Sequence, residues 1–352
     1  MGRTNPAQEK KITIDDVARL SGVSKTTISR YLNDKYDAFS DETRRRIKEV
    51  ITELDYHPNR SAQRLKASKT RLIGCVIADI SSPFSAQLLK GVTSVCEARG
   101  YQVLFADSDE DPEKEARIIQ GLIENRVDGL VVNTTGGNDE LLFSTSDKDT
   151  PVVLADRRIN GTRQLDTVEH ANREVAYKCM RLLSDFGYER VAFFTHGNRN
   201  IAPRVLRYDG YLEGIRDFFP EAEPVKYEFD RNREEDCIRC IREFRNSFPT
   251  ERIAILTVNG IASQKVLLAM SKTEYELGYD YGLCSFDDWE WLKLAPPGIT
   301  SVLLPSYEIG TKSAEILLDN ISRGESQGRE PVNIMLPGII NVRGSTTKIK
   351  NY

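Results

Sequence analysis

The sequence has few of the residues, and none of the short motifs, on which many enzymes depend. Only three histidines occur in 352 residues, and none has the spacing of a metal site. There is no GxxxxGK phosphate loop, no GxGxxG, no GxSxG and no HExxH. These absences argue against nucleotide hydrolysis, dinucleotide chemistry, serine hydrolysis and metallopeptidase activity. We therefore expect no enzyme, no metal and no cofactor.

The sequence also lacks a segment that would direct it to a membrane or to export. Its apolar runs are strand-sized, well below the ~18 residues of a membrane helix. The start, MGRTNPAQEKK, is polar and has no apolar stretch like that of a secretion signal. Six cysteines are scattered, and the one CxxC pair, Cys237 and Cys240, lies in the charged helical pattern EEDCIRCIREF. A half-buried helix face explains this pair better than metal or redox use. We expect a cytoplasmic protein with reduced thiols.

The charge is distributed unevenly along the chain. Residues 1–71 carry a formal net charge of +6, whereas residues 72–352 carry −10. A basic head on an acidic body predicts that only the head meets a polyanion. Small basic segments are common, so the charge by itself is weak support for nucleic-acid binding.

The sequence predicts three short helices between residues 13 and 57. A capping-box pattern at Thr13 starts the first, and Gly22 supplies the left-handed backbone that ends it. Ser24 caps the second helix, KTTISRYL, in which Lys25 and Arg30 are free to donate to guanine edges. Two helices around a short turn indicate a helix-turn-helix, whose second helix enters the major groove. A plain helical hairpin shares this pattern and is the alternative.

The stretch ITIDDVARLSGVSKTTISRYLN resembles the headpiece of LacI-family regulators, with the pattern T-I-x-D-V-A-x-x-A-G-V-S-x-x-T-V-S-R-x-L-N. Ser21 replaces the usual alanine and Ile28 the usual valine. SDETRRRIKEVITELDYHPNRSAQRLK continues the match through the family's third helix. The resemblance implies double-stranded operator DNA as a partner. We expect the DNA contacts of the head, residues 1–57, from Thr13, Ser24, Lys25, Thr26, Thr27, Ser29, Arg30 and Asn33.

Residues 58–71 alone would be described as a flexible basic linker. The resemblance instead implies a hinge helix, capped by Asn59, that folds on DNA beside its mate from a second subunit. Ala62 and Lys66 match positions that touch the minor groove. Leu65 matches a leucine wedged between the central base pairs, which bends the duplex. We expect DNA contacts from all four residues and a homodimer.

From residue 72 onward, strand patterns alternate with helical patterns, which predicts an α/β body with parallel sheets. A single domain of about 280 residues would be large, so we expect two lobes. Lobe 1 should comprise about 72–168 and 303–331, and lobe 2 about 169–302 and 332–352. Strands are predicted at 72–78, 102–106, 129–132, 151–155, 191–195, 253–258 and 281–286, and helices at 84–99, 113–126, 173–186, 205–219, 233–247, 261–271 and 307–322.

Several predicted strands end in a residue suited to hydrogen bonding. Ligands bind beyond the carboxyl ends of parallel strands, so these tips should line one cleft between the lobes. Each residue by itself could also be an ordinary turn or cap. The set comprises Asp79, Asp107, Asn133, Asp156, Asn259 and Asp287.

The body also resembles the LacI family's periplasmic-binding-protein-like effector domain, so the likeness covers nearly the whole chain. Arg207 in RYDGYLEG matches an arginine that clamps the effector, and Asp287 in SFDDW an aspartate that bonds its hydroxyls. Gly260 in TVNG replaces the usual aspartate, and Glu169-His170 stands where Asp-Asn is common. Trp289 could pack on a sugar face or belong to the core. We expect effector contacts from Asp79, Phe84, Asp156, Arg207, Asn259, Asp287 and Trp289.

These features imply a transcription repressor of carbohydrate-related genes that binds a palindromic operator as a dimer. Its allosteric effector should be a sugar, a sugar acid or a sugar phosphate. Arg157, Arg158 and Arg204 near Arg207 hint at an anion, which arginine pairs through a bidentate fork. An exported sugar-binding protein with this body is the rival that the basic head and polar N-terminus argue against. Control by a partner protein in place of a small effector stays open.

Overall fold

The structure, a computed structural model, describes residues 12–32, 34–36, 39–56, 69–148, 150–159, 161–197, 201–324 and 329–347. The chain divides into two units, residues 1–70 and 71–352, and each is described by itself. Among the described residues, no helix is long and apolar enough to cross a membrane.

The first unit contains α1 (Ile14–Ser21), α2 (Lys25–Leu32) and α3 (Asp41–Glu53). Thr13 closes the predicted capping box with Asp16, and Gly22 ends α1 with a left-handed φ of 63°. The three helices pack around one small apolar core. Each helix is too short to be stable without this packing. Its buried members are Val17, Ala18, Ile28, Ile47 and Tyr56.

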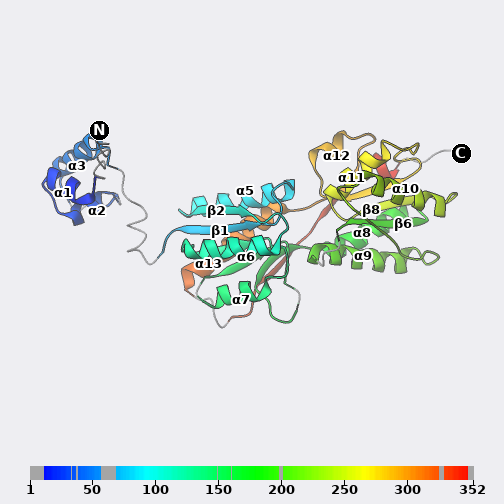
Figure 1. Cartoon of the computed structure of the whole chain (residues 1–352), viewed down its shortest axis with the longest axis horizontal. Helices are drawn as coiled ribbons and strands as arrows, with labels where there is room; N and C mark the ends of the chain where they lie inside the picture. Colours follow the sequence, from blue (N-terminus) through cyan, green and yellow to red (C-terminus); the bar gives the residue numbers. More distant parts are fainter. Residues whose placement is uncertain are drawn as a thin grey trace, which may run out of the picture. The chain divides into compact units, whose positions relative to one another are not determined.

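The second unit is built on two six-stranded sheets (Figure 1). The order in the first is β11-β5-β4-β3-β1-β2, and in the second β12-β10-β9-β8-β6-β7. All pairs are parallel except β10 with β12. The strands are β1 (Leu72–Ile77), β2 (Gln102–Asp107), β3 (Gly129–Val132), β4 (Val152–Ala155), β5 (Asp166–His170), β6 (Arg190–His196), β7 (Val225–Phe229), β8 (Ile253–Thr257), β9 (Gly282–Phe286), β10 (Thr300–Leu303), β11 (Asn333–Leu336) and β12 (Ile339–Asn341).

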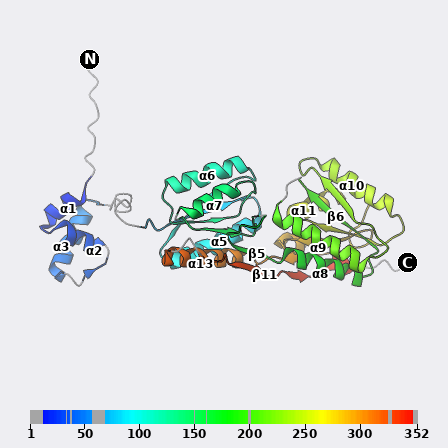
Figure 2. The same ribbon diagram turned by 90° about the horizontal axis from the view of Figure 1, so that it is seen from below.

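Helices cover both faces of each sheet (Figure 2), as parallel sheets require. In lobe 1, α5 and α13 pack on one face, and α6 and α7 on the other. In lobe 2, α8 and α9 lie opposite α10 and α11. The bounds are α5 (Pro83–Ala98), α6 (Pro112–Glu124), α7 (Asp139–Asp147), α8 (Asn172–Asp185), α9 (Ala202–Phe218), α10 (Glu234–Ser247), α11 (Gly260–Met270), α12 (Glu290–Leu294), α13 (Ser306–Arg323) and α14 (Gly344–Thr347). This arrangement confirms the predicted fold class.

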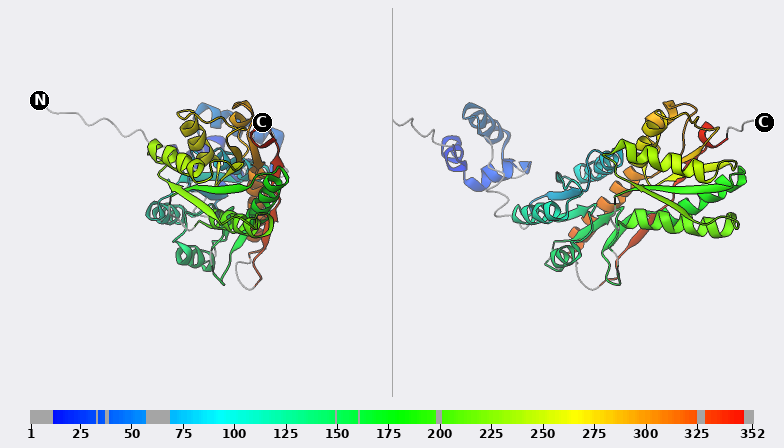
Figure 3. Two further views of the ribbon diagram at one scale, coloured as in Figure 1. Left: turned by 90° about the vertical axis from the view of Figure 1, so that its right-hand side faces the viewer. Right: turned by 45° about the vertical axis from the view of Figure 1, so that its right-hand side comes forward.

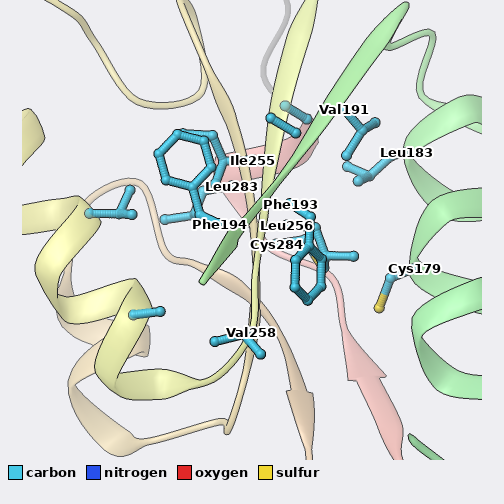
Figure 4. Close-up of a cluster of buried hydrophobic side chains, with 14 of the residues drawn as sticks. Cys179, Leu183, Val191, Phe193, Phe194, Ile255, Leu256, Val258, Leu283 and Cys284 are labelled. Carbon is cyan, nitrogen blue, oxygen red and sulfur yellow. The ribbon is translucent and has the colours of Figure 1, made fainter. Parts of the chain in front are cut away.

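Buried side chains of the central strands form the core of lobe 2. Phe193 and Phe194 of β6 point to opposite faces of the sheet and are 1% and 0% exposed (Figure 4). Cys179 and Cys284 belong to the same cluster, so their thiols are packing groups. Burial raises the pKa of Cys237 to about 12 and of Cys240 to about 11, which keeps both as inert thiols.

The chain passes between the two lobes after β5, between β10 and α13, and again between β11 and β12 (Figure 3). The last passage differs from the predicted lobe limits. Residues 333–336 were expected in lobe 2, but they pair in register with Thr167–His170 at the edge of the first sheet. Asp166 fixes this pairing, because its Oδ1 accepts a bond from Val332 N at 2.8 Å. Residues 169 and 170 likewise belong to the first sheet.

Two glycines let α8 and α9 approach closely. A Cβ at Gly210 would lie 2.2 Å from the carbonyl oxygen of Arg173, and one at Gly214 would lie 2.2 Å from Met180 Cβ. Gly210 is the first glycine of the RYDGYLEG motif, so this motif glycine is a helix-contact residue one turn from Arg207.

Gly210→Ala should therefore force the two helices apart and lower the free energy of unfolding by roughly 1–3 kcal/mol. Gly121→Ala is the matched control, because Gly121 lies in α6 and a Cβ added there would meet nothing within 4 Å. There the substitution should stabilise by about 0.5–1 kcal/mol through helix propensity. Urea unfolding of both variants checks this, and equal changes would contradict the close contact.

Candidate functional site

Six of the seven predicted effector residues line one cavity between the lobes, of about 70 Å³. They come from the ends of strands in both sheets and from the helices that follow, as the rule for parallel sheets predicts. Trp289 is not among the lining residues, whereas Asn133 is. The six are Asp79, Phe84, Asp156, Arg207, Asn259 and Asp287.

Asp156 and Asp287 occupy equivalent positions in the two lobes. Each directly follows a buried strand, β4 or β9, and each has a left-handed φ of 67°. A residue other than glycine in this conformation costs of the order of 1 kcal/mol, and such residues gather at functional sites. The conformation turns both carboxylates out of their strands toward the cavity that they line.

Several directed contacts fix the side chain of Arg207 in the cavity wall. It lies on α9, is 5% exposed, and its guanidinium lies over the Phe286 ring with 4.3 Å from Cζ to the ring centroid. Its Nε donates to Asn172 Oδ1 at 2.8 Å, and its Nη1 to the carbonyl oxygen of Val258 at 2.6 Å. These contacts fix the direction of the guanidinium before any ligand arrives.

A third bond of Arg207 runs to His170, which sequence reasoning left without a role. Nη2 donates to His170 Nε2 at 2.8 Å, so this imidazole must be neutral with its proton on Nδ1. Burial and the neighbouring guanidinium hold the pKa of His170 well below its usual range. The unusual Glu169-His170 pair was the visible signal. Asn172, two residues on, gave none, because its partner lies 35 positions away.

Burial dominates the electrostatics of the two aspartates. It raises the pKa of Asp156 to about 6, although Arg207 and Arg157 pull it down. It also raises the pKa of Asp287, which Arg207 and the Gly260 amide lower. Asp156 Oδ1 has no hydrogen-bond partner among the described residues, and Asp287 Oδ2 accepts a bond from Gly260 N at 2.8 Å. Such carboxylates can accept bonds from hydroxyl groups of a ligand.

The raised pKa of Asp156 predicts a pH dependence of stability. The folded state holds this proton up to about pH 6, against 3.8 for the ordinary carboxyl. Stability contributed by protonation is thus complete below about pH 4 and is lost as the pH rises through 6, by up to about 3 kcal/mol. Asp156→Asn should remove this part of the fall. Urea unfolding of both proteins from pH 4 to 7.5 checks it, and parallel profiles would contradict the assignment.

Asn259 forms part of the cavity wall in lobe 2 and lies next to His196. Asn259 Oδ1 caps α11 by accepting a bond from Ala262 N at 2.9 Å, and it lies 3.2 Å from His196 Nε2. Burial lowers the pKa of His196 to about 4, so this ring is neutral at physiological pH. Asn259 therefore stabilises the start of α11 and also lines the cavity.

Trp289 packs against the start of α11 instead of lining the cavity. A Cβ at Gly260 would lie 2.8 Å from its indole ring, so the ring fills the space above that glycine. The ring of Trp291 lies against it, with centroids 6.0 Å apart. Gly260 stands where the family usually has aspartate, and its lack of a side chain leaves room for the Trp289 ring. The predicted stacking of this tryptophan on a sugar has no support from its position.

Charged and aromatic groups also join the lobes at the cavity. Arg231 of lobe 2 lies 3.9 Å from Asp79 of lobe 1. Phe84 packs against the cores of both lobes. Within lobe 1, Arg157 pairs with Glu110 at 2.6 Å. The contacts of Arg231 and Phe84 span the two lobes and would change if the lobes moved apart.

In the first unit, α2 presents the predicted DNA-reading residues on its outer side. Lys25, Thr26 and Arg30 are exposed, and Ile28 is fully buried beneath them. Lys25 Nζ lies 2.5 Å from Asp15 Oδ1, and both side chains are exposed. A DNA phosphate could take the place of Asp15 as the partner of Lys25. The remaining described candidates are the exposed Ser24, the half-buried Thr27 and Ser29, and Thr13, which is exposed and engaged in the capping box. Asn33, Asn59, Ala62, Leu65 and Lys66 lie outside the described residues.

The described residues contain no group of three histidine, cysteine or acidic side chains that could hold a metal ion.

Two family models match the chain. Residues 13–59 match bacterial regulatory proteins of the lacI family, and residues 70–336 match the periplasmic binding proteins and sugar binding domain of the LacI family. The first match lies within the first structural unit, and the second begins at the boundary between the two units.

Relatives with both parts are similar along nearly their full length. The HTH-type transcriptional regulator KdgR of Bacillus subtilis is 36% identical over 95% of this chain and 97% of its own. PtxS of Pseudomonas putida is 31% identical over 96% of each. These relatives are named as regulators of transcription and not as enzymes.

Solved structures share the fold. The Lac repressor dimer bound to operator and the anti-inducer ONPF has a TM-score of 0.81 at 21% identity, covering 96% of this chain and 99% of that one. The CelR–cellobiose complex has a TM-score of 0.67 at 24% identity, covering 95% and 99%. With the family matches and the relatives, the conclusion is direct: this chain belongs to the LacI family and is a DNA-binding regulator of transcription, not an enzyme.

Proposed function

We propose that this regulator represses carbohydrate-related genes by binding a near-palindromic operator as a homodimer. A sugar, sugar acid or sugar phosphate in the cavity around Arg207 controls that binding. The observation that carries the proposal is the convergence of six predicted effector residues, drawn from both lobes, on one cavity whose arginine is already held in place.

The DNA part of the proposal rests on the outer side of α2. Lys25, Thr26 and Arg30 would contact base edges or phosphates, with Ser24, Thr13 and Asn33 beside them. Two heads of a symmetric dimer would read half-sites roughly 34–36 Å apart. Asn59, Ala62, Leu65 and Lys66 would complete the interface as a hinge helix in the minor groove.

The effector part rests on the size and chemistry of the cavity. Its volume of about 70 Å³ is well below the ~300 Å³ of a pocket that buries a small ligand, so a sugar requires the lobes to separate. The contacts of Arg231 with Asp79 and of Phe84 with both cores would then change. A carbohydrate ligand agrees with the cellobiose named in the CelR complex. The change in lobe closure would be transmitted to the heads through the hinge in the cytoplasm, where operator DNA lies.

Selection of bound duplexes from a random pool tests the DNA part. The full chain should enrich an inverted repeat, and its affinity should fall steeply with salt, because each phosphate contact releases a counterion. A thermal-shift screen of sugars, sugar acids and sugar phosphates tests the effector part, since a true ligand raises Tm by mass action. If the protein enriches no inverted repeat, with or without each of these ligands present, the proposal is wrong.

A further inference from the structure

Arg204 occupies a place in the cavity that its own contacts do not explain. It lies on α9 one turn before Arg207, lines the same cavity and is partly exposed to it. Its Nη1 donates to the carbonyl oxygen of His196 at 3.2 Å, which is its one hydrogen bond within the described part of the chain. Among the described residues, no carboxylate lies within 4.0 Å of its guanidinium.

The other arginines of the cavity each have a partner. Arg157 pairs with Glu110 at 2.6 Å, and Arg231 lies 3.9 Å from Asp79. Arg207 makes three hydrogen bonds and interacts with Asp156 and Asp287. Arg204 is therefore the cavity arginine without a counter-ion in the described part of the chain.

The surroundings of Arg204 make this arrangement electrostatically unfavourable. The pKa of Arg204 is lowered to about 10, chiefly by burial; Glu110 opposes this shift, and the charges of Arg157, Arg207 and Arg231 contribute to it. The group stays charged at neutral pH, so several cations share a small volume. An anion bound between them would remove this repulsion and gain bidentate hydrogen bonds.

The acidic side of the cavity restricts what that anion can be. Asp156 and Asp287 are buried carboxylates that a second anion would not approach without cost, whereas hydroxyl groups could donate to them. A ligand with one anionic group and several hydroxyls satisfies both sides. A neutral sugar satisfies only the carboxylates and leaves Arg204 as it is.

We propose that Arg204 is the specificity-determining residue for an anionic carbohydrate, whose carboxylate or phosphate pairs with its guanidinium while the hydroxyls meet the aspartates. This inference rests on the proposed effector function of the same cavity. It selects the charged members of the effector class over the neutral sugars.

The first experiment needs no ligand and uses the full-length protein. Arg204→Met removes the charge but keeps much of the side-chain volume, and Tm of the unliganded variant should rise by a few degrees, since an uncompensated partly buried cation is removed. Arg181→Met is the matched control, because Arg181 is an exposed helical arginine of the same lobe, and its Tm should not rise. A lower Tm for Arg204→Met would show a structural role and overturn the proposal.

The second experiment is calorimetry at constant ionic strength with glucose, gluconate and glucose 6-phosphate, extended to the same three forms of other hexoses and of pentoses. Wild type should prefer a charged form over its neutral parent, and the carboxylate and phosphate arms show which anion is recognised. Arg204→Gln should lose roughly 10- to 100-fold in affinity for that form, the contribution of a charge-assisted hydrogen bond.

Arg204→Gln should bind operator DNA as wild type does, which separates this test from the proposed function as a whole. A wild-type protein that does not bind the operator would count against the proposed function. Equal affinity for neutral and charged sugars, or a preference for anions that survives in Arg204→Gln, would overturn the role of Arg204 alone.

Discussion

Replacement of Arg207 by lysine is expected to lower effector affinity more than 100-fold while the protein still binds its operator. The lysine keeps the positive charge near Asp156 and Asp287 but cannot make the three directed bonds to Asn172, Val258 and His170. Lysine also loses the planar contact with Phe286. Isothermal titration with the effector found by the screen measures the loss.

Arg207→Ala should add a loss of stability, because it leaves two buried carboxylates without their nearby cation. Breaking such a buried cluster costs about 3–5 kcal/mol. Urea unfolding measures this, with Arg239→Ala on the exposed side of α10 as the control that should change little. An Arg207→Lys protein that binds and responds to effector like wild type would contradict the central place of this guanidinium.

The second large effect is expected at the other end of the chain. Arg30→Ala should reduce operator affinity by at least roughly 30-fold, because a base contact is worth about 1–3 kcal/mol and the proposed dimer would lose it twice. The guanidinium of Arg30 is exposed, and no carboxylate among the described residues lies within 4.0 Å of it. An exposed guanidinium can donate to a base edge.

Fluorescence anisotropy with the selected operator measures the effect of Arg30→Ala, and calorimetry should find its effector affinity unchanged. Arg45→Ala is the control in the same unit, since Arg45 is an exposed arginine of α3 only 3.8 Å from Glu49. It should leave the sequence preference intact. Equal losses for DNA and effector in Arg30→Ala would contradict the separation of the two activities.

The sequence predicted the elements whose side chains are apolar. β1, β3, β4, β8 and β9 are entirely buried and mostly apolar, which is typical of central parallel strands. β5 was missed although it is equally buried, because its sequence is DTVEH. Its polar side chains are accommodated by residues distant in the chain: Asp166 by Asn320 and Arg329, and His170 by Arg207. No local pattern carries that information.

The candidate site divides in the same way. Strand-end positions and motif matches placed Asp156, Asp287 and Arg207 together, because the rule for parallel sheets is a rule of topology. The supporting contacts of Arg207 could not be predicted, since they depend on packing of α8 against α9. The sequence predicted Trp289 in the cavity, but its indole fills the space above Gly260 instead. That space is a property of the folded chain and not of either residue.

We propose that occupancy of the cavity and binding of DNA are thermodynamically coupled. Effector affinity should be determined by calorimetry with and without saturating operator, and operator affinity with and without saturating effector. Both affinities should change, and by the same factor in the two experiments. An effector whose affinity is unaffected by operator would contradict it, however tightly each ligand binds alone.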